Sequence, residues 1–268
     1  MRRYVCAASL LFSLQCAPGQ SQQPPQTNGV ERDPQAISVI QQSIISMGGA
    51  KVIAQVQTVI AQGSIEAFPG TAGPTGSVVI EDQFSTQVHE FRDSFRSGSL
   101  TQDFTSGHGS PGVVSNGHGK RFSQHMANFR LPVHLPMLIL AAALANPNCN
   151  ITLAGQTTVS GQRAVQVHLH VDTDVLQQTL SIQDWYFDPT TGLPLRVEYR
   201  LPDASNTLFF VNATSDFSDF RPVQGILFPF QTLSYQDGKP KNVLLISSVA
   251  LNQSIVSTDF DPPVAVAQ

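Results

Sequence analysis

Two histidines in the sequence are spaced so that they could bind a metal ion together. His168 and His170 are two residues apart in an expected β-strand, and alternate residues of a strand face the same side. Two imidazoles on one face could supply part of a zinc site. No third ligand lies nearby in the sequence, and the alternative is a solvated strand face. We therefore predict no metal.

The other histidines show no catalytic pattern. His108 and His118 each lie between two glycines, which indicates loops. The sequence has no Gly-x-Ser-x-Gly elbow, no His-Glu-x-x-His and no phosphate-binding loop. Because a Ser-His-Asp triad is defined by geometry rather than sequence order, a hydrolase that uses a loop histidine stays a third hypothesis. The prediction is that the protein has no catalytic residue and needs no cofactor.

Phenylalanines give the best chemical hint. They crowd two adjacent expected strands, at Phe209, Phe210, Phe217, Phe220, Phe228 and Phe230. Phe209 and Val211 would face one side of the sheet and Phe210 the other. In an antiparallel sheet with one solvent-exposed face, apolar and polar residues alternate more regularly than they do here. Either both faces are covered by other parts of the chain, or one face lines an apolar cavity.

The strands that carry these residues belong to an antiparallel meander between Asp184 and Leu251. Turn residues separate its strands: Pro189 and Gly192 suit a longer turn, and Asp237-Gly238 suits a two-residue turn. The expected strands are 184–187, 193–201, 207–217, 226–235 and 241–251. Short strands with regularly spaced turn signals are typical of a meander.

The preceding chain adds one or two helices and more strands. Asp33 is an expected N-cap with Pro34 in the first turn, and Gly48-Gly49 ends the helix. A helical turn is expected at 174–178. The strands are expected at 58–67, 77–84, 87–93, 99–105, 150–159 and 163–171, with a further hairpin within 107–120 around Val113-Val114.

The segment Leu131–Ala145 contains no charged residue, and its sequence predicts a helix from Pro136 onward. A helix that is apolar on every side is buried on every side. The simpler interpretation is a core helix packed on the sheet. The alternative is a plug or lid whose movement opens and closes a cavity for an apolar ligand.

Together these elements predict an α+β fold: an incomplete antiparallel β-barrel, made of a single curved sheet, with helices packed on its concave side. We expect a signal peptide at 1–19, a flexible linker at 20–32 and a single half-barrel domain at 33–268. Cys16 is a candidate for a lipid anchor, although Gln15 is bulky where such sites take a small residue. Cys149, alone in the mature chain, is expected to be a small half-buried hydrophobe.

Composition narrows the classes of partner. Charged residues make up 13% of the 268 residues, the formal net charge is −4, and no basic tract exists. Nucleic-acid binding therefore lacks the cationic surface that it needs. A low-charge surface behind a signal peptide suits a periplasmic or secreted protein, and we expect a monomer.

Two motifs resemble those of a known family. They are Tyr186-Phe187-Asp188-Pro189-Thr190-Thr191-Gly192-Leu193-Pro194-Leu195-Arg196 and Asp219-Phe220-Arg221-Pro222-Val223-Gln224-Gly225-Ile226-Leu227-Phe228-Pro229. The chain resembles the outer-membrane lipoprotein-sorting superfamily of LolA, LolB, LppX and RseB-like proteins, most clearly over Trp185–Leu251. The resemblance implies an incomplete β-barrel closed by helices around an apolar cavity, and a role in carrying lipids or lipoprotein acyl chains or in sensing envelope stress.

The leading hypothesis is therefore a non-enzymatic periplasmic carrier that buries the acyl chains of a lipid or an acylated protein. Its expected cavity lining is Leu135, Leu138, Leu140, Phe209, Val211 and Phe230. The alternative is an envelope-stress sensor or assembly module that binds an envelope protein partner through the same apolar surface.

Overall fold

The computed structural model describes residues 29–71, 75–84, 89–107, 110–116, 118–121, 131–171, 179–202 and 209–261. The predicted signal peptide, Cys16, most of the predicted linker and the helical turn expected at 174–178 lie outside these ranges. Within them, no helix is both long and apolar enough to cross a bilayer.

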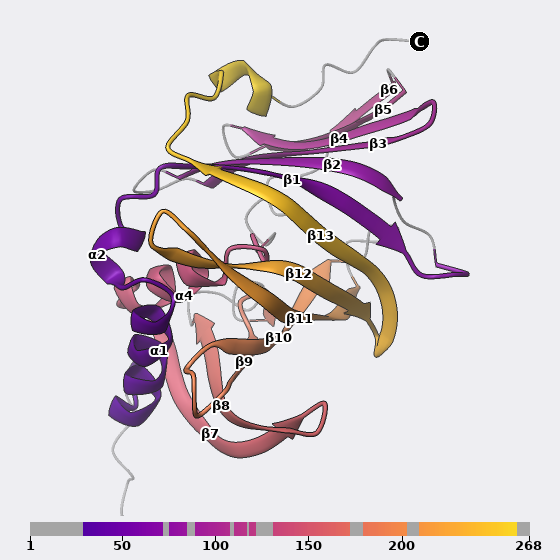
Figure 1. The fold of residues 1–268 in the computed structure, drawn as a ribbon. Coiled ribbons are helices and arrows are strands. Elements are labelled where there is room, and N and C mark those ends of the chain that lie inside the picture. Colours follow the sequence, from indigo (N-terminus) through magenta and orange to yellow (C-terminus); the bar gives the residue numbers. More distant parts are fainter. Residues whose placement is uncertain are drawn as a thin grey trace, which may run out of the picture.

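The described strands form one 13-stranded antiparallel sheet that curls without closing (Figure 1). Its order is β6-β5-β4-β3-β2-β1-β13-β12-β11-β10-β9-β8-β7. The strands are β1 Thr58–Ala67, β2 Gly76–Phe84, β3 His89–Ser97, β4 Leu100–Gly107, β5 Ser110–Ser115, β6 His118–Arg121, β7 Cys149–Val159, β8 Gln162–Val171, β9 Gln183–Phe187, β10 Pro194–Pro202, β11 Phe210–Val223, β12 Ile226–Gln236 and β13 Lys239–Leu251. The predicted fold class is confirmed.

Two meanders, β1–β6 and β7–β13, make up this sheet, and the pairing of β1 with β13 joins them. The turn chemistry places most strand ends correctly, and Asp237 and Gly238 both have positive φ as expected. Three details differ most from the prediction. β3 ends at Ser97, four residues beyond the expected end at 93. β11 continues to Val223, because it stays paired with β12 up to the turn at Gln224-Gly225. Val113 and Val114 both lie in β5 rather than at the hairpin turn.

The helices in the described ranges are α1 Pro34–Ser46, α2 Ala50–Ile53 and α4 Pro136–Ala145, with a 3₁₀ turn, η1, at Ser257–Phe260. The Asp33 carboxylate accepts hydrogen bonds from the backbone N–H groups of Gln35 and Ala36, so the predicted N-cap is confirmed. Arg32 donates to the carbonyl oxygens of Leu144 and Asn146, at 2.9 and 2.8 Å. A guanidinium at the carbonyl end of α4 is favoured by the helix dipole and ties α1 to α4.

The apolar helix α4 is not buried on every side, which corrects the prediction. The buried residues of α4 all lie in its first half, whereas Ala142 and Ala145 in its second half are exposed. The buried ones are Pro136, Met137, Ile139 and Leu140. Alanine has a small side chain, so exposing these two residues to water leaves little apolar area unburied and has a small free-energy cost. The helix is therefore a fixed part of the core at its start.

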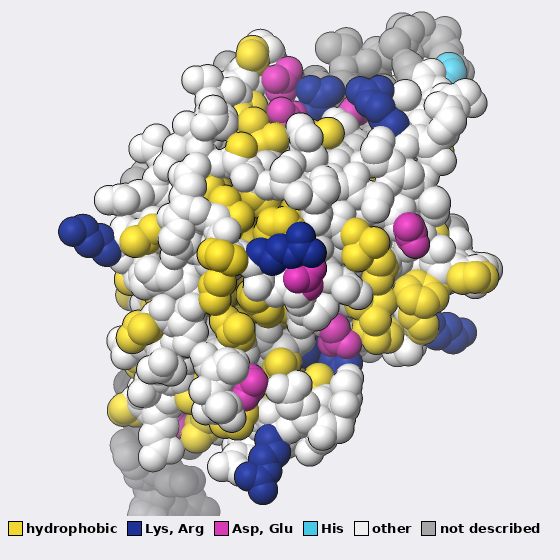
Figure 2. Space-filling view, in the orientation of Figure 1, with side chains coloured by type: hydrophobic (Ala, Val, Ile, Leu, Met, Phe, Trp, Pro, Cys, Tyr) yellow, Lys and Arg dark blue, Asp and Glu magenta, His cyan; other side chains and the backbone are white. Residues whose placement is uncertain are grey.

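The core lies where α1 and α4 pack on the inner face of the sheet. Ile40, Met47, Leu140 and Trp185 are completely or almost completely buried there. Cys149 is also buried in this cluster, more completely than the half-buried position expected for it, and burial raises the pKa of its thiol. In the space-filling view, hydrophobic side chains are visible in the middle of the face, and Lys or Arg and Asp or Glu side chains lie among them as well as near the edges (Figure 2).

The chain passes very close to β12 at Gly48, where α1 ends. Gly48 has φ +127°, and an added Cβ would lie 2.4 Å from the carbonyl oxygen of Gly225. We expect Gly48→Ala to lower the free energy of unfolding by about 2–3 kcal/mol, through backbone strain and overpacking. Urea denaturation measures the effect. Gly98→Ala is the control, because Gly98 has φ +56° but no neighbouring atom within 4 Å. Equal losses in both variants would contradict the close-approach argument.

Candidate functional site

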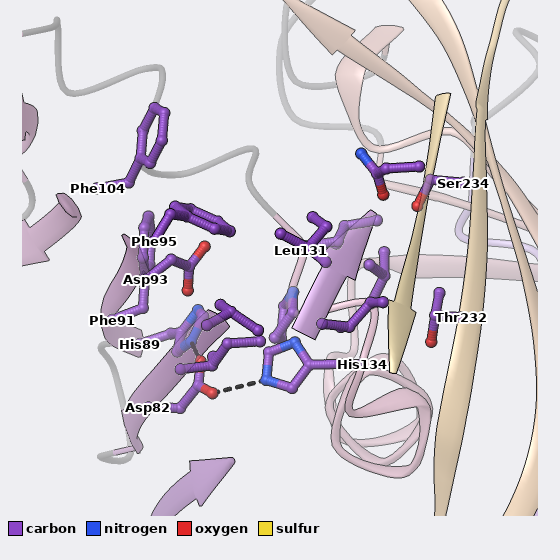
Figure 3. A pocket seen from close by; sticks show the side chains of 17 residues that line it. Asp82, His89, Phe91, Asp93, Phe95, Phe104, Leu131, His134, Thr232 and Ser234 are labelled. Carbon is purple, nitrogen blue, oxygen red and sulfur yellow. Dashed lines mark hydrogen bonds and ion pairs between the residues drawn. The ribbon is translucent and has the colours of Figure 1, made fainter. Parts of the chain in front are cut away.

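A cavity of about 280 Å³ lies on the inner face of the sheet, next to the buried core cluster, to which its lining residues Val78 and Ile80 belong (Figure 3). Strands β1–β4 form one wall and β12 and β13 form the other. The segment Leu131–His134, just before α4, lies between the two walls. Apolar side chains make up most of the lining: Ile65, Val78, Ile80, Phe91, Phe95, Phe104, Leu131, Pro132, Val133 and Leu244.

A buried carboxylate hydrogen-bonded to two histidines interrupts this apolar lining. Asp82 lies on β2 and is 1% exposed. Its Oδ1 lies 2.8 Å from Nε2 of His89 on β3, and its Oδ2 lies 2.7 Å from Nε2 of His134. Asp93, Thr232, Ser234 and Asn242 also reach the cavity. The site thus combines apolar walls with a compact polar group, which we call the Asp82 cluster (Asp82, His89 and His134).

Strand periodicity explains how Asp82 enters the cavity. Val78, Ile80 and Asp82 are the buried residues of β2, so the carboxylate takes an inward position. Burial by itself would raise the pKa of Asp82, but the charges and hydrogen bonds of His134 and His89 hold that pKa well below its usual range. Asp82 is therefore ionised, and both Nε2 atoms act as donors.

The ring of His89 is held in place by aromatic neighbours. It stacks on Phe84, with 4.8 Å between ring centroids, and it contacts Phe91 at 5.5 Å. His134, in contrast, comes from a segment that is neither helix nor strand. The Asp82 cluster therefore connects two strands of the sheet to the non-regular wall of the cavity.

The six residues predicted to line a cavity lie elsewhere. Leu135 and Leu140 are buried in the core and Leu138 packs partly buried against it. Phe230 is also buried in the core, two residues before Thr232 of the cavity. Val211 is half-buried and Phe209 is 65% exposed. The described lining of this cavity contains none of the six, and their role in binding stays a prediction.

His168 and His170 lie side by side as expected, with ring centroids 5.2 Å apart. Nδ1 of His168 lies 3.0 Å from the carboxylate of Asp184 on β9. In the described part of the chain, no group of three or more histidine, cysteine or acidic side chains is placed to hold a metal ion. The pair forms part of a polar strand face.

The pKa of His168 is raised, chiefly by its hydrogen bond to Asp184. This contact therefore contributes stability below the ordinary imidazole pKa of about 6.5, and the contribution is lost as the pH rises through the folded-state value. We expect Asp184→Asn to lower the pKa of His168 measured by NMR titration. Asp188→Asn, in the turn after β9, is the control. An unchanged His168 titration in Asp184→Asn would contradict the assignment.

The sequence itself has no recognised relative in two comparisons. No family model matches the chain. No curated protein matches it either.

Solved structures do match over most of the chain. A domain described as an outer membrane lipoprotein-sorting protein domain, from Vibrio parahaemolyticus, has a TM-score of 0.55 at 12% identity, over 85% of this chain and 96% of that one. A DUF1329 family protein from Desulfovibrio piger has a TM-score of 0.54 at 14% identity, over 86% and 98%. A LolA superfamily protein from Nitrosomonas europaea has a TM-score of 0.52 at 12% identity, over 84% and 97%. The chain has the LolA-superfamily fold.

Within this LolA-like fold, the Asp82 cluster is a site that the sequence did not predict. Asp82 and His134 are 52 residues apart, and His134 was one of several scattered histidines. One signal was available: Asp82 occupies an inward position between Ile80 and Phe84 on a strand that alternates. A charged residue in such a position is rarely buried without a partner. The sequence did not show which residue the partner was.

Proposed function

We propose that this protein binds a single apolar chain, such as an acyl chain of a lipid or of an acylated protein, in the cavity between β1–β4 and β12–β13. The observation that carries the proposal is an apolar cavity of about 280 Å³ on the inner face of the LolA-like sheet. Ligand pockets usually measure about 300–1,000 Å³, so this volume favours one chain over several. The structural similarity to a lipoprotein-sorting protein domain supports the same class of ligand.

The mechanism is passive burial. Apolar area that leaves water contributes about 25 cal/mol per Å², so an acyl chain gains several kcal/mol on entering the cavity. Phe91, Phe95 and Phe104 supply aromatic surface from β3 and β4, and Leu244 faces them from β13. The protein acts without catalysis, in the periplasm or outside the cell, after removal of the signal peptide at 1–19. Mass spectrometry of the N-terminal peptide of the mature protein tests the cleavage. A chain that begins near Gln20 has lost Cys16 with the signal peptide, whereas a chain that begins at an acylated Cys16 has the lipid anchor instead.

Mass spectrometry of organic extracts tests the binding directly. Protein purified without detergent is expected to release a stoichiometric acyl-containing lipid. Delipidated protein is then expected to take up a fluorescent long-chain alkyl probe. Absence of both the extracted lipid and probe uptake would refute the proposal.

A pair of adjacent substitutions on β13 shows whether the cavity is the site. Leu244 lines the cavity, whereas Leu245 follows it on the same strand and points to the other face. We expect Leu244→Trp to fill the cavity and weaken probe binding about tenfold or more, a loss of about 1.4 kcal/mol or more. Leu245→Trp should bind the probe like the unmodified protein. Equal weakening in both variants would place the probe elsewhere.

Exposed aromatic side chains favour a second candidate, a protein partner in the cell envelope. Phe209 and Phe210, at the start of β11, are 65% and 36% exposed. Exposed aromatic residues often anchor interfaces. A partner that copurifies in stoichiometric amount without lipid, and that is lost in a Phe209→Ala/Phe210→Ala variant, would support this candidate over the carrier.

A further inference from the structure

The inward side of β12 changes from apolar to polar where the strand enters the cavity. Ile226, Phe228 and Phe230 are buried in the core. The next two inward positions of the strand are Thr232 and Ser234, and both line the cavity. Apolar side chains in these two positions would continue the core, so the change gives this part of the strand a different role.

The neighbouring strand β13 makes the same change at the same level of the sheet. Its inward residues Ile246 and Leu244 are apolar, and the next inward residue is Asn242, which lines the cavity. Asn242 pairs with Ser234 across the two strands, so their side chains lie next to each other on the cavity wall. We call Thr232, Ser234 and Asn242 the polar ledge.

The polar ledge has hydrogen-bonding groups that the described protein does not use. Thr232 is 2% exposed, so its hydroxyl is nearly cut off from bulk solvent. In the part of the chain that the structure describes, no side-chain hydrogen bond joins Thr232, Ser234 or Asn242 to another residue. Buried hydroxyl and amide groups are normally hydrogen-bonded. A molecule in the cavity can supply the partners of the ledge.

The acidic side chains of the cavity are already engaged. Figure 3 shows Asp82 and His89 on the opposite side of the cavity from Thr232 and Ser234. Both carboxylate oxygens of Asp82 accept from imidazoles, at 2.8 and 2.7 Å. Asp93 also lines the cavity and has an interaction of its own. The polar end of a ligand therefore meets the ledge, whose three side chains are uncharged.

The chemistry of the ledge selects the polar end that fits it. A charged group placed among neutral partners loses far more free energy of hydration than an uncharged group that gains hydrogen bonds. Hydroxyl and amide side chains can both donate and accept, as can the hydroxyl groups of a glycerol. An uncharged end that carries hydroxyl groups therefore matches the ledge better than a carboxylate or an ammonium group does.

We propose that the cavity binds a single-chain lipid of the monoacylglycerol class, with its hydroxyl-bearing end on Thr232, Ser234 and Asn242 and its acyl chain along the apolar walls. The inference rests on the proposed function, because it names the class of ligand that fills the same cavity. It adds that a free fatty acid is a poor ligand.

Displacement of the fluorescent alkyl probe from the full chain, without the predicted signal peptide, tests this selectivity. The competitors are monolauroylglycerol, laurate and dodecyltrimethylammonium, which carry chains of equal length and are used below their micelle concentrations. We expect monolauroylglycerol to displace the probe at a concentration about tenfold or more below that needed for laurate. The ammonium compound should also displace the probe less well than monolauroylglycerol does.

Substitutions on the ledge show where the polar end binds. Thr232→Val/Ser234→Ala removes two hydroxyl groups with little change in size, and should weaken monolauroylglycerol about tenfold while the alkyl probe binds as before. Thr214→Val/Ser218→Ala is the matched control, because both residues lie on the outward side of β11 and should leave all affinities unchanged. Asn242→Lys places an ammonium group on the ledge and should reverse the preference towards laurate.

The outcomes separate this inference from the binding function. Tight probe binding with equal displacement by monolauroylglycerol and laurate would overturn the inference and leave the carrier intact. An unchanged preference in both Thr232→Val/Ser234→Ala and Asn242→Lys would also overturn it. If the probe does not bind, the proposed function fails, and titration calorimetry with monolauroylglycerol decides the inference: no binding overturns it, whereas binding that is weakened in Thr232→Val/Ser234→Ala supports it.

Discussion

Replacing Trp185 by alanine is expected to lower the free energy of unfolding by about 3–5 kcal/mol, the usual cost of truncating a buried large aromatic residue. Trp185 is completely buried on β9. Its ring stacks on Phe217 and Phe187, with centroid distances of 6.0 and 6.3 Å. Its indole N–H donates to the side-chain oxygen of Gln183 at 2.8 Å. Truncation leaves a large hole between β9 and β11.

Urea denaturation followed by circular dichroism measures this loss, because Trp185 is the only tryptophan and its fluorescence disappears with it. Phe209→Ala is the control. Phe209 is also a large aromatic residue but is 65% exposed, so its truncation should change the free energy of unfolding by no more than about 0.5 kcal/mol. A loss below about 1 kcal/mol for Trp185→Ala would show that β9 does not pack as described.

Replacing Asp82 by alanine is expected to lower the free energy of unfolding by about 3–5 kcal/mol near neutral pH, because the buried carboxylate is lost and both partly buried histidines lose the acceptor of their Nε2–H. The loss should depend on pH in a defined direction. The histidines hold the folded-state pKa of Asp82 below its unfolded value. The stabilisation by the carboxylate is therefore complete above about pH 4 and is lost as the pH falls further, towards the folded-state pKa.

The difference in stability between the two proteins should consequently shrink on acidification below about pH 4. Urea denaturation over a pH series measures it. Asp219→Ala is the matched control, since Asp219 pairs with Arg221 on the exposed surface and little of its contribution survives solvent screening. A constant difference between the unmodified protein and Asp82→Ala down to pH values well below 4 would contradict the ionised, histidine-bound carboxylate.

Local chemistry predicted much of the fold. The strand at Thr58–Ala67 was expected with the bounds that it has, and Asp33, Pro34 and the Asp237-Gly238 turn act as their residue types suggest. These features depend on a few neighbouring residues and on the period of the apolar positions. The resemblance of the 186–229 region then pointed to the fold, which the structural comparison confirms.

The candidate site could not be predicted in the same way. Alternation shows that two residues share a face but not which part of that face remains open. Phe230 and Thr232 are close in sequence, yet one fills the core and the other lines the cavity. The sequence places Phe209 in a strand, but β11 begins one residue later, at Phe210, and the side chain of Phe209 is exposed. The Asp82 cluster depends on contacts between β2, β3 and a loop, which only the folded chain brings together.

The pairing of β1 with β13 has a consequence for biogenesis. Val59 of β1 pairs with Leu251 of β13. The β1 edge of the first meander therefore has no partner strand until nearly all of the described chain has been synthesised. Such late, long-range pairing slows folding and leaves an apolar strand edge able to pair with other chains. Newly made molecules should therefore depend on a chaperone that shields β1, and lowering the expression rate should raise the yield of soluble protein.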